Sequence, residues 1–299
     1  MSEPVHNQEH DGLTPPPFHD DADNFTGRML GTLSASSFAR NLYSGLTHVP
    51  LLGTLVHAAA GKVFAGKKRV WARIPHGLGK GLWLKIDPRF EYQMLSGDHE
   101  REAQELLAAQ LKPGDCFYDV GAHTGFFSLA AARLVSDSGR VIAFEADPEN
   151  AALLRATVAK NNFPQIEVVE AAVWSSSGPV EFERAPSASS LVDGKVGKVA
   201  SSNINRVQVA GITLDEYISR SGSIPPTFLK IDVELSESEV LDGAAELFRT
   251  SRPFVLCEVH TYENRNKVRT WLSARNYRLH NMDGRSTLPM WFVASDEEQ

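Results

Sequence analysis

The chain has 299 residues and a formal net charge of −7, with 42% hydrophobic and 22% charged residues. This composition indicates a soluble globular enzyme with one large core, either alone or with an N-terminal extension. Because Lys67-Lys68-Arg69 is the longest basic run of an acidic chain, the charge pattern argues against a nucleic-acid partner.

The N-terminal segment divides into two parts. Residues 1–25 contain Pro15-Pro16-Pro17 and many acids but lack the basic and apolar regions of a secretory signal, so we expect a disordered tail. Residues 26–68 are expected to form a helical extension that packs against the main domain. Its stretch 49–63 is mostly apolar, but Pro50 and nearby glycines argue against a stable membrane span. An interfacial or partner-docking helix pair is the alternative.

A β-hairpin and a helix are predicted ahead of the main domain. Apolar residues alternate over 70–74 and again over 82–86, on either side of a glycine-rich loop, which is typical of a hairpin. Residues 100–111 carry an apolar helical face and are followed by a Lys-Pro-Gly stop. We therefore assign 69–111 to a hairpin and helix leading in, and 112–299 to the main domain.

A glycine loop between a strand and a helix predicts a nucleoside site. Strand 116–120 stops at Gly121, and the loop through Gly125 must turn sharply, so that a backbone without Cβ atoms can approach a ligand. A second strand ends about 20 residues later at Glu145, where a carboxylate can accept hydrogen bonds from both ribose hydroxyls. These three residues are the predicted cofactor contacts. An ordinary strand–helix turn with two structural glycines is the alternative.

The glycine spacing favours S-adenosylmethionine over a nicotinamide dinucleotide. A dinucleotide site needs Gly-x-Gly-x-x-Gly, whereas this loop offers Gly-x-x-x-Gly and lacks the second glycine. Asp119, next to the loop, would repel a pyrophosphate but can pair with the cationic amino group of a methionine moiety.

Two later predicted strands end in titratable side chains. Strand 227–234 ends in Asp232 and Glu234, and strand 254–260 ends in His260. Since strands and helices alternate, the sheet is expected to be mostly parallel, with its ligands at the carboxyl ends of the strands.

Local patterns predict three further features of the C-terminal half. Residues 185–203 are rich in Ser, Gly and Lys and form either a mobile lid or a surface excursion. Ser236 and Glu239 form a capping box for one helix, whose apolar stripe continues to Phe248. The two predicted closing strands are 277–280 and 290–294.

Both cysteines lie inside apolar runs that are typical of strands. Cys116 and Cys257 are therefore expected to be reduced core residues, as in a cytoplasmic protein. The sequence has no Cys/His spacing typical of a metal site, so none is predicted.

Five stretches, taken in order, resemble the FkbM family of S-adenosylmethionine-dependent methyltransferases. They are 111–115, 119–125, 144–148, 229–234 and 257–260. The resemblance implies an α/β, Rossmann-like class I methyltransferase fold, with a seven-stranded, mostly parallel sheet and a C-terminal antiparallel hairpin. It also implies O-methylation of a hydroxyl of a small molecule, often a sugar or secondary metabolite, with S-adenosylmethionine as cofactor.

The resemblance also assigns roles to individual residues. By position, Gly121, Gly125 and Glu145 hold the cofactor, Glu170 and Ala171 lie near the adenine, and Asp232, Glu234 and His260 face the substrate. The chain departs from the family at Leu235, where glycine is usual, and at His123, where many members have asparagine. A position that needs positive φ strains a bulky side chain, so Leu235 puts the direction of Glu234 in question.

His260 is the first candidate for the base that removes the acceptor's hydroxyl proton, because an imidazole titrates near neutrality. A histidine at a strand end that only satisfies a neighbouring group is the alternative. Asp232 and Glu234 are alternatives that orient the hydroxyl or hold a divalent ion. Two rival functions stay open: a cofactor-binding fold-mate without turnover, motivated by Leu235, and a dinucleotide oxidoreductase, disfavoured by the glycine spacing. The sequence has no signature of the acceptor's identity or of the oligomeric state.

Overall fold

The computed structural model describes residues 69–87, 91–95, 99–184, 205–282, 284 and 287–296. The tail predicted for 1–25, the helical extension predicted for 26–68 and the lid predicted for 185–203 lie outside the described residues. Across the described ranges, no helix reaches the length and hydropathy that a bilayer-crossing segment needs.

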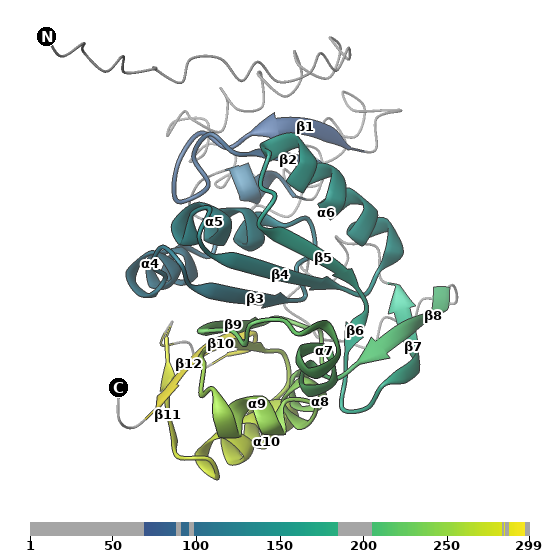
Figure 1. Ribbon diagram of the computed structural model, residues 1–299, viewed down its shortest axis with the longest axis vertical. Helices are drawn as coiled ribbons and strands as arrows, with labels where there is room; N and C mark the ends of the chain where they lie inside the picture. Colours follow the sequence, from purple (N-terminus) through teal and green to yellow (C-terminus); the bar gives the residue numbers. More distant parts are fainter. Residues whose placement is uncertain are drawn as a thin grey trace, which may run out of the picture.

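A seven-stranded sheet forms the centre of the molecule (Figure 1). Its strands, in spatial order, are β11 Tyr277–Asn281, β12 Met290–Asp296, β10 Phe254–Val259, β9 Phe228–Ile231, β3 Cys116–Val120, β4 Arg140–Glu145 and β5 Ile166–Glu170. The five strands from β10 to β5 run parallel, whereas β12 is antiparallel to both β10 and β11. The predicted α/β fold with a C-terminal antiparallel hairpin is therefore confirmed.

Helices cover both faces of this sheet (Figure 1). One face carries α4 Arg101–Gln110, α5 Phe126–Val135 and α6 Pro148–Asn161, and the other carries α7 Leu214–Ser221, α8 Glu237–Asp242, α9 Ala245–Thr250 and α10 Tyr262–Ser273. Strand side chains alternate between two buried clusters, so Phe117 packs with α5 while its neighbours Cys116 and Tyr118 pack with α7 to α10. Full burial of a large apolar side chain stabilises the fold by about 1.5–3 kcal/mol.

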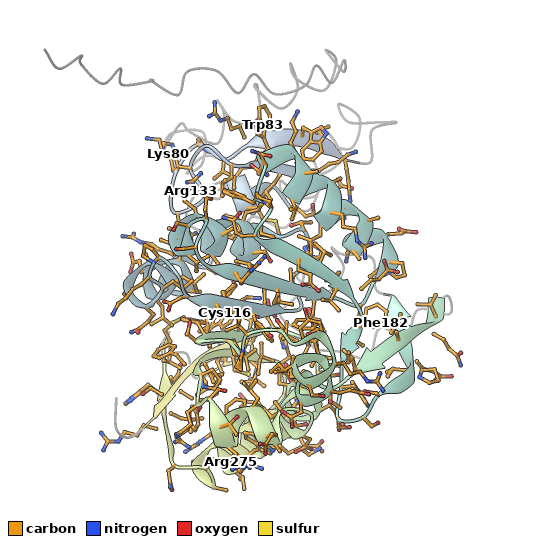
Figure 2. The ribbon with its side chains drawn as sticks, viewed as in Figure 1. Lys80, Trp83, Cys116, Arg133, Phe182 and Arg275 are labelled. Carbon is orange, nitrogen blue, oxygen red and sulfur yellow. The ribbon has the colours of Figure 1, made fainter. Side chains whose placement is uncertain are left out.

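The N-terminal hairpin is packed onto the same core. Its elements are β1 Val70–Arg73, β2 Trp83–Ile86 and the 3-10 helix η1 Tyr92–Leu95. The strands pair antiparallel, as predicted. Asn161, in α6, accepts a hydrogen bond from the backbone N–H of Trp83 at 2.8 Å and donates one to its carbonyl at 2.8 Å. The Arg133 guanidinium of α5 donates to the carbonyl of Lys80 at 2.8 Å (Figure 2).

A small second sheet lies beside the carboxyl end of β5 (Figure 1). Its strands, in spatial order, are β6 Ala172–Val173, β8 Asn205–Ile212 and β7 Gly178–Arg184. β7 and β8 pair antiparallel, and Phe182 of β7 lies away from the main sheet (Figure 2). The residues that join these two strands are those expected to form the lid.

The helix predicted from Ser236 through Phe248 is two helices, because tertiary contacts interrupt it. A Cβ on Gly243 would lie 2.1 Å from the carbonyl oxygen of Trp174, so the chain turns there with its backbone packed against that carbonyl. The Asp215 carboxylate accepts hydrogen bonds from two backbone N–H groups of the first turn of α9, each at 2.8 Å, and so caps that helix. Within the described residues, Ser236 makes no side-chain capping bond, so the capping-box prediction is wrong.

Candidate active site

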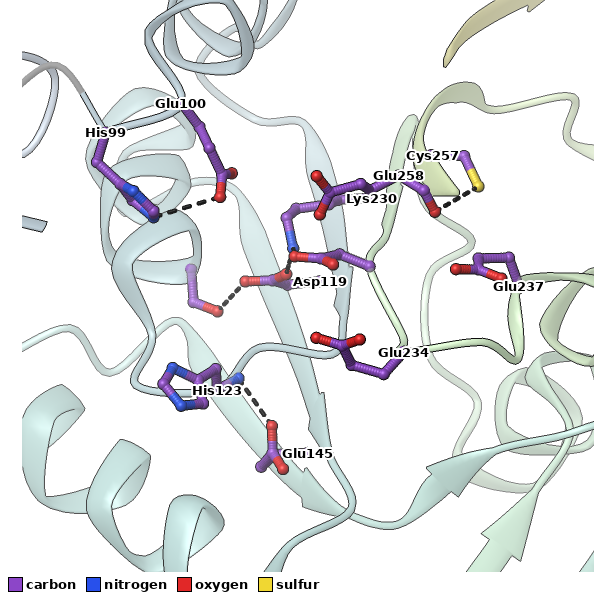
Figure 3. A network of polar contacts seen from close by, with 12 residues as sticks. His99, Glu100, Asp119, His123, Glu145, Lys230, Glu234, Glu237, Cys257 and Glu258 are labelled. Carbon is purple, nitrogen blue, oxygen red and sulfur yellow. Dashed lines mark hydrogen bonds and ion pairs between the residues drawn. The ribbon is translucent and has the colours of Figure 1, made fainter. Parts of the chain in front are cut away.

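The carboxyl ends of β3, β4, β9 and β10 lie close together at the centre of the sheet (Figures 1 and 3). The chain first builds the sheet outward from β3 to β5 and then returns to place β9 on the other side of β3. Such a switch point is where open parallel sheets bind their ligands. β9 ends at Ile231, earlier than predicted, so Asp232 and Glu234 lie in the turn that leads to α8.

The two glycines of the loop lie so close to other parts of the protein that a Cβ at either position would clash. Gly121 has φ +85°, and a Cβ there would lie 1.9 Å from the carbonyl oxygen of Asp232. Gly125 has φ +92°, and a Cβ there would lie 2.3 Å from Cδ1 of Leu154. Both positions therefore need glycine for backbone conformation and close packing, in addition to the ligand approach that the sequence predicts.

Glu145 holds the glycine loop through its carboxylate (Figure 3). Its Oε2 accepts a hydrogen bond from the backbone N–H of His123 at 2.7 Å, and its Oε1 accepts one from the N–H of Asp147 at 2.9 Å. Burial raises the pKa of Glu145 to about 7, although these two hydrogen bonds act in the opposite direction. Since an ionised carboxylate has about four acceptor sites, each oxygen retains capacity for a ribose hydroxyl.

His123 adopts the left-handed backbone conformation, with φ +49°. Asparagine and histidine are both enriched in that region, which explains why histidine replaces the family's asparagine here. Its Nε2 lies 3.9 Å from Oε1 of Glu91, whose Oε2 pairs with Arg69 at 2.8 Å. The loop is thus connected to the N-terminal hairpin.

Two further predicted cofactor residues lie beside Glu145. Glu170 is the register partner of Glu145 on β5, and its Oε2 pairs with Nη1 of Arg155 at 2.8 Å. Ala171 follows directly and is buried. Both stand at the same edge of the sheet as the predicted ribose contact.

A buried lysine connects Asp119 to Asp232. Lys230 is 2% exposed, and its Nζ lies 3.3 Å from Oδ1 of Asp119 and 3.1 Å from Oδ2 of Asp232. Asp119 is fully buried and also accepts a hydrogen bond from Oγ of Ser128 at 2.6 Å. Burial would lower the pKa of Lys230, but the two carboxylates outweigh it and raise that pKa, so the lysine is cationic. Sequence reasoning did not identify this role of Lys230.

Glu258 is a second residue that sequence reasoning did not place in the site, although its stretch was part of the resemblance. Its Oε2 lies 3.5 Å from Nε2 of His260, and its charge state is linked to that of Asp232. Burial and then the charge of Asp232 raise the pKa of Glu258. Burial would also raise the pKa of Asp232, but Lys230 and His260 outweigh it and lower that pKa. This environment favours the protonated form of Glu258 and the ionised form of Asp232.

His260 projects from the end of β10 toward these acids. Its Nε2 lies 3.5 Å from Oε2 of Glu258, 3.9 Å from Oε2 of Glu234 and 4.0 Å from Oδ1 of Asp232. Its Nδ1 lies 2.6 Å from Oε1 of Glu237, a residue that the sequence analysis did not single out. Burial would lower the pKa of His260, but the bond to Glu237 and the surrounding carboxylates outweigh it and raise that pKa.

Leu235 does adopt positive φ, at +71°, as its place in the resemblance predicts. Its side chain is 53% exposed, so few neighbours oppose the conformation. The preceding Glu234 has a side chain that is 71% exposed yet still reaches toward His260. The backbone thus tolerates leucine without turning Glu234 away from the site.

The charge balance of the site fits a cationic ligand. Carboxylates outnumber the two cationic side chains, Lys230 and His260, among the described residues at these strand ends. S-adenosylmethionine brings a positive sulfonium and a positive amino group, so these residues fit that cofactor. Asp232, Glu258 and His260 also offer ligand atoms within 4.8 Å of one another, a separation that a divalent cation can bridge.

Comparisons with known proteins identify a family. Residues 119–279 match the family model of the methyltransferase FkbM domain. The hexuronic acid methyltransferase AglP of Haloferax volcanii is 29% identical over 163 residues, which cover 54% of this chain and 62% of that protein. A probable cobalt-precorrin-6B C(15)-methyltransferase (decarboxylating) of Sulfolobus acidocaldarius is 38% identical over 65 residues, which cover 22% of this chain and 34% of that protein. The chain thus spans less than two thirds of the length of either relative.

Solved structures are also among the proteins to which the chain is similar. Methyltransferase FkbM from Methylobacillus flagellatus KT has a TM-score of 0.43 and 17% identity, covering 68% of this chain and 53% of that chain. TYW2 of M. jannaschii, in complex with AdoMet, has a TM-score of 0.44 and 12% identity, covering 77% of this chain and 85% of that chain. Because the family match over 119–279 takes in more than half of the 299 residues, the chain belongs to the FkbM family of S-adenosylmethionine-dependent methyltransferases.

Proposed function

We propose that the protein is an O-methyltransferase that acts on a hydroxyl of a small molecule or a sugar. The observation that carries this proposal is the convergence of His260 with Asp232 and Glu234, at the strand ends beside the glycine loop. The name of the Haloferax relative, a hexuronic acid methyltransferase, supports a sugar acceptor. The net charge of −7 gives no support to a nucleic-acid acceptor.

The cofactor would lie along the carboxyl ends of β3 to β5. Glu145 would accept hydrogen bonds from the ribose hydroxyls, and Glu170 and Ala171 would lie at the adenine. Gly121 and Gly125 would shape the loop between them. Asp119 is buried and paired with Lys230, so it would act on the amino group of the methionine moiety only through its negative charge. When bound, S-adenosylmethionine supplies an electrophilic methyl group on sulfur.

In the transfer, the acceptor oxygen forms a bond to the methyl carbon while the sulfur–methyl bond breaks, leaving S-adenosylhomocysteine. His260 would accept the hydroxyl proton at Nε2, and Asp232 and Glu234 would orient the hydroxyl. Since the pKa of His260 is raised, only its neutral fraction acts as the base. The rate should therefore keep rising with pH above the ordinary histidine pKa of about 6.5.

Methyl transfer to a panel of hexuronic acids, neutral sugars and hydroxylated secondary metabolites tests the proposal. We expect His260→Ala to lower kcat by at least about 100-fold and Asp232→Ala to lower it less, while calorimetry finds unchanged S-adenosylhomocysteine affinity. If His260→Ala retains the full rate, the base is another group. If the wild type binds S-adenosylhomocysteine but methylates no acceptor, the protein is a fold-mate without turnover.

A metal-assisted transfer is the second candidate, since Asp232, Glu258 and His260 lie within reach of one cation. Treatment with EDTA separates the two mechanisms. The base mechanism predicts an unchanged rate. A loss of activity that Mg²⁺ restores would favour the metal-assisted reaction instead.

A further inference from the structure

Glu237 is a fully buried acid whose two carboxylate oxygens contact His260 and Asn264. It is 0% exposed, at the first residue of α8, and its Oε1 lies 2.6 Å from Nδ1 of His260. Burying a carboxylate is costly unless hydrogen bonds compensate for the lost hydration. The short contact to the imidazole supplies part of that compensation.

Asn264 of α10 holds the other carboxylate oxygen of Glu237. Its Nδ2 donates to Oε2 of Glu237, and its Oδ1 accepts from the backbone N–H of Ser238 at 3.4 Å. The backbone N–H of Asn264 donates in turn to Oγ1 of Thr261, at 3.1 Å. Asn264 is itself buried, so its donor and acceptor sides have fixed partners from α8. The carboxylate of Glu237 is therefore oriented before any ligand arrives.

The contacts of the imidazole determine which nitrogen carries its hydrogen in the neutral form. An ionised carboxylate accepts but cannot donate, so Glu237 requires a hydrogen on Nδ1. Three other acids face Nε2, namely Asp232 and Glu234 from the β9 turn and Glu258 from β10, at 3.5–4.0 Å. Of these, Asp232 and Glu234 favour a hydrogen on Nε2 when they are ionised, which would block the predicted base, whereas a protonated Glu258 can donate to Nε2. The 2.6 Å contact at Nδ1 outweighs their longer contacts.

We propose that Glu237, oriented by Asn264, is a positioning residue that keeps Nε2 of His260 unprotonated and directed at the acceptor hydroxyl. The inference rests on the proposed function, because it concerns the base of that reaction. Glu237 touches neither cofactor nor acceptor and acts only through His260. The arrangement follows the general pattern of a base oriented by a third group.

The Glu237→Gln variant tests the proposal, because it keeps the side-chain size and removes the charge. We expect kcat to fall by at least about tenfold, with the acceptor KM and the S-adenosylhomocysteine affinity within about twofold of wild type. Asn264→Ala should lower kcat by a smaller factor, since it frees one oxygen of Glu237. Glu239→Gln, on the same helix, is the matched control and should leave kcat unchanged.

Non-additivity shows whether Glu237 acts through His260. In the His260→Ala background, adding Glu237→Gln should change kcat by less than about twofold. A further loss in the double variant, or full kcat in Glu237→Gln, would overturn the proposal. If Glu237→Gln lowers the thermal midpoint and the S-adenosylhomocysteine affinity enough to account for the lost kcat, Glu237 has only a structural role. That result would also overturn the proposal.

A spectroscopic readout separates this inference from the proposed function. Nitrogen-15 NMR of histidine-labelled protein, at a pH where the ring is neutral, reports the nitrogen that carries the hydrogen. We expect Nδ1 in the wild type and Nε2 in Glu237→Gln, with His260→Ala assigning the signal. Nε2 in the wild type would overturn the inference whether or not any acceptor is methylated. If NMR finds the hydrogen on Nδ1 but the protein methylates no acceptor, the inference about Glu237 stands and the proposed function is wrong.

Discussion

The glycine loop depends on one buried carboxylate, and that makes cofactor binding sensitive to pH. Glu145 connects the loop to the start of α6 through two backbone N–H groups, in an environment that raises its pKa to about 7. Only its ionised form can accept hydrogen bonds from both ribose hydroxyls. The position of this acid is readable from its spacing, but its pKa depends on burial that spacing does not report.

We therefore predict that S-adenosylhomocysteine binds more weakly as the pH falls below 7. Binding favours the ionised carboxylate, so affinity should fall by about tenfold for each pH unit below that pKa. Calorimetry from pH 5.5 to 8 measures this slope. Glu145→Gln should bind weakly at every pH and remove the slope, whereas a slope that survives in this variant would assign the titration to another group.

Leu235 is the residue at which the chain departs most clearly from the glycine of its family. The left-handed conformation, at φ +71°, costs a non-glycine residue about 1–2 kcal/mol. Glycine loses more conformational entropy on folding, at a cost of about 0.5–1 kcal/mol, and this offsets part of the backbone strain that the substitution removes. We expect Leu235→Gly to raise the free energy of unfolding by up to about 1 kcal/mol in urea titrations. Leu235→Ala keeps the Cβ and should bring no gain; equal stabilisation by both would show that backbone strain is not the cause.

At the scale of elements, the region from 236 to 250 shows how tertiary contacts override a local pattern. Its apolar stripe is continuous and predicts one helix, but Gly243 packs against the carbonyl of Trp174 and the chain turns there. Asp215, a residue of α7, then supplies the cap of α9. A cap contributed by another helix leaves no mark in the local sequence, so a cap was expected only at Ser236, where the single predicted helix begins.

Removing this cap should destabilise the protein modestly. Asp215→Ala leaves two N–H groups of α9 without their acceptor, and loss of a helix cap costs about 1 kcal/mol. Chemical denaturation should show that loss, while Ser236→Ala should change stability by less than about 0.5 kcal/mol. A larger effect at Ser236 than at Asp215 would contradict the assignment of the cap.

At the scale of the whole molecule, Lys230 joins the two halves of the sheet at the switch point. It lies on β9 and pairs with Asp119 of β3, while its ammonium lies 5.2 Å from the ring of Phe127 and 5.9 Å from the ring of Trp291. The lysine thus contacts α5, on one face, and β12, in the C-terminal hairpin. Its charge also holds Asp232 ionised beside His260.

We predict that Lys230→Met strongly destabilises the fold. Removing one partner of a buried ion pair leaves an uncompensated charge on Asp119, which costs about 3–5 kcal/mol. Thermal and urea unfolding measure the loss. The double variant Lys230→Met with Asp119→Asn should recover part of it, because the unpaired charge is gone. Failure of the double variant to recover any stability would show that packing, and not charge, explains the effect.

The sequence by itself determined the alternation of strands and helices, the glycine loop and the acids that follow the strands. These features depend on residues close together in the chain, so hydrophobic periodicity and spacing report them. The same patterns indicated the cofactor, because Gly121, Gly125 and Glu145 lie in one strand–loop–helix–strand unit.

Only the tertiary structure decided which side chains meet across different elements. The partner of Asp119 is Lys230, and the acid that contacts Nδ1 of His260 is Glu237. Each pair joins residues from different strands or helices, whose separation in the sequence carries no information about distance. The pKa of each group depends on burial and on those neighbours, and folding alone brings both about.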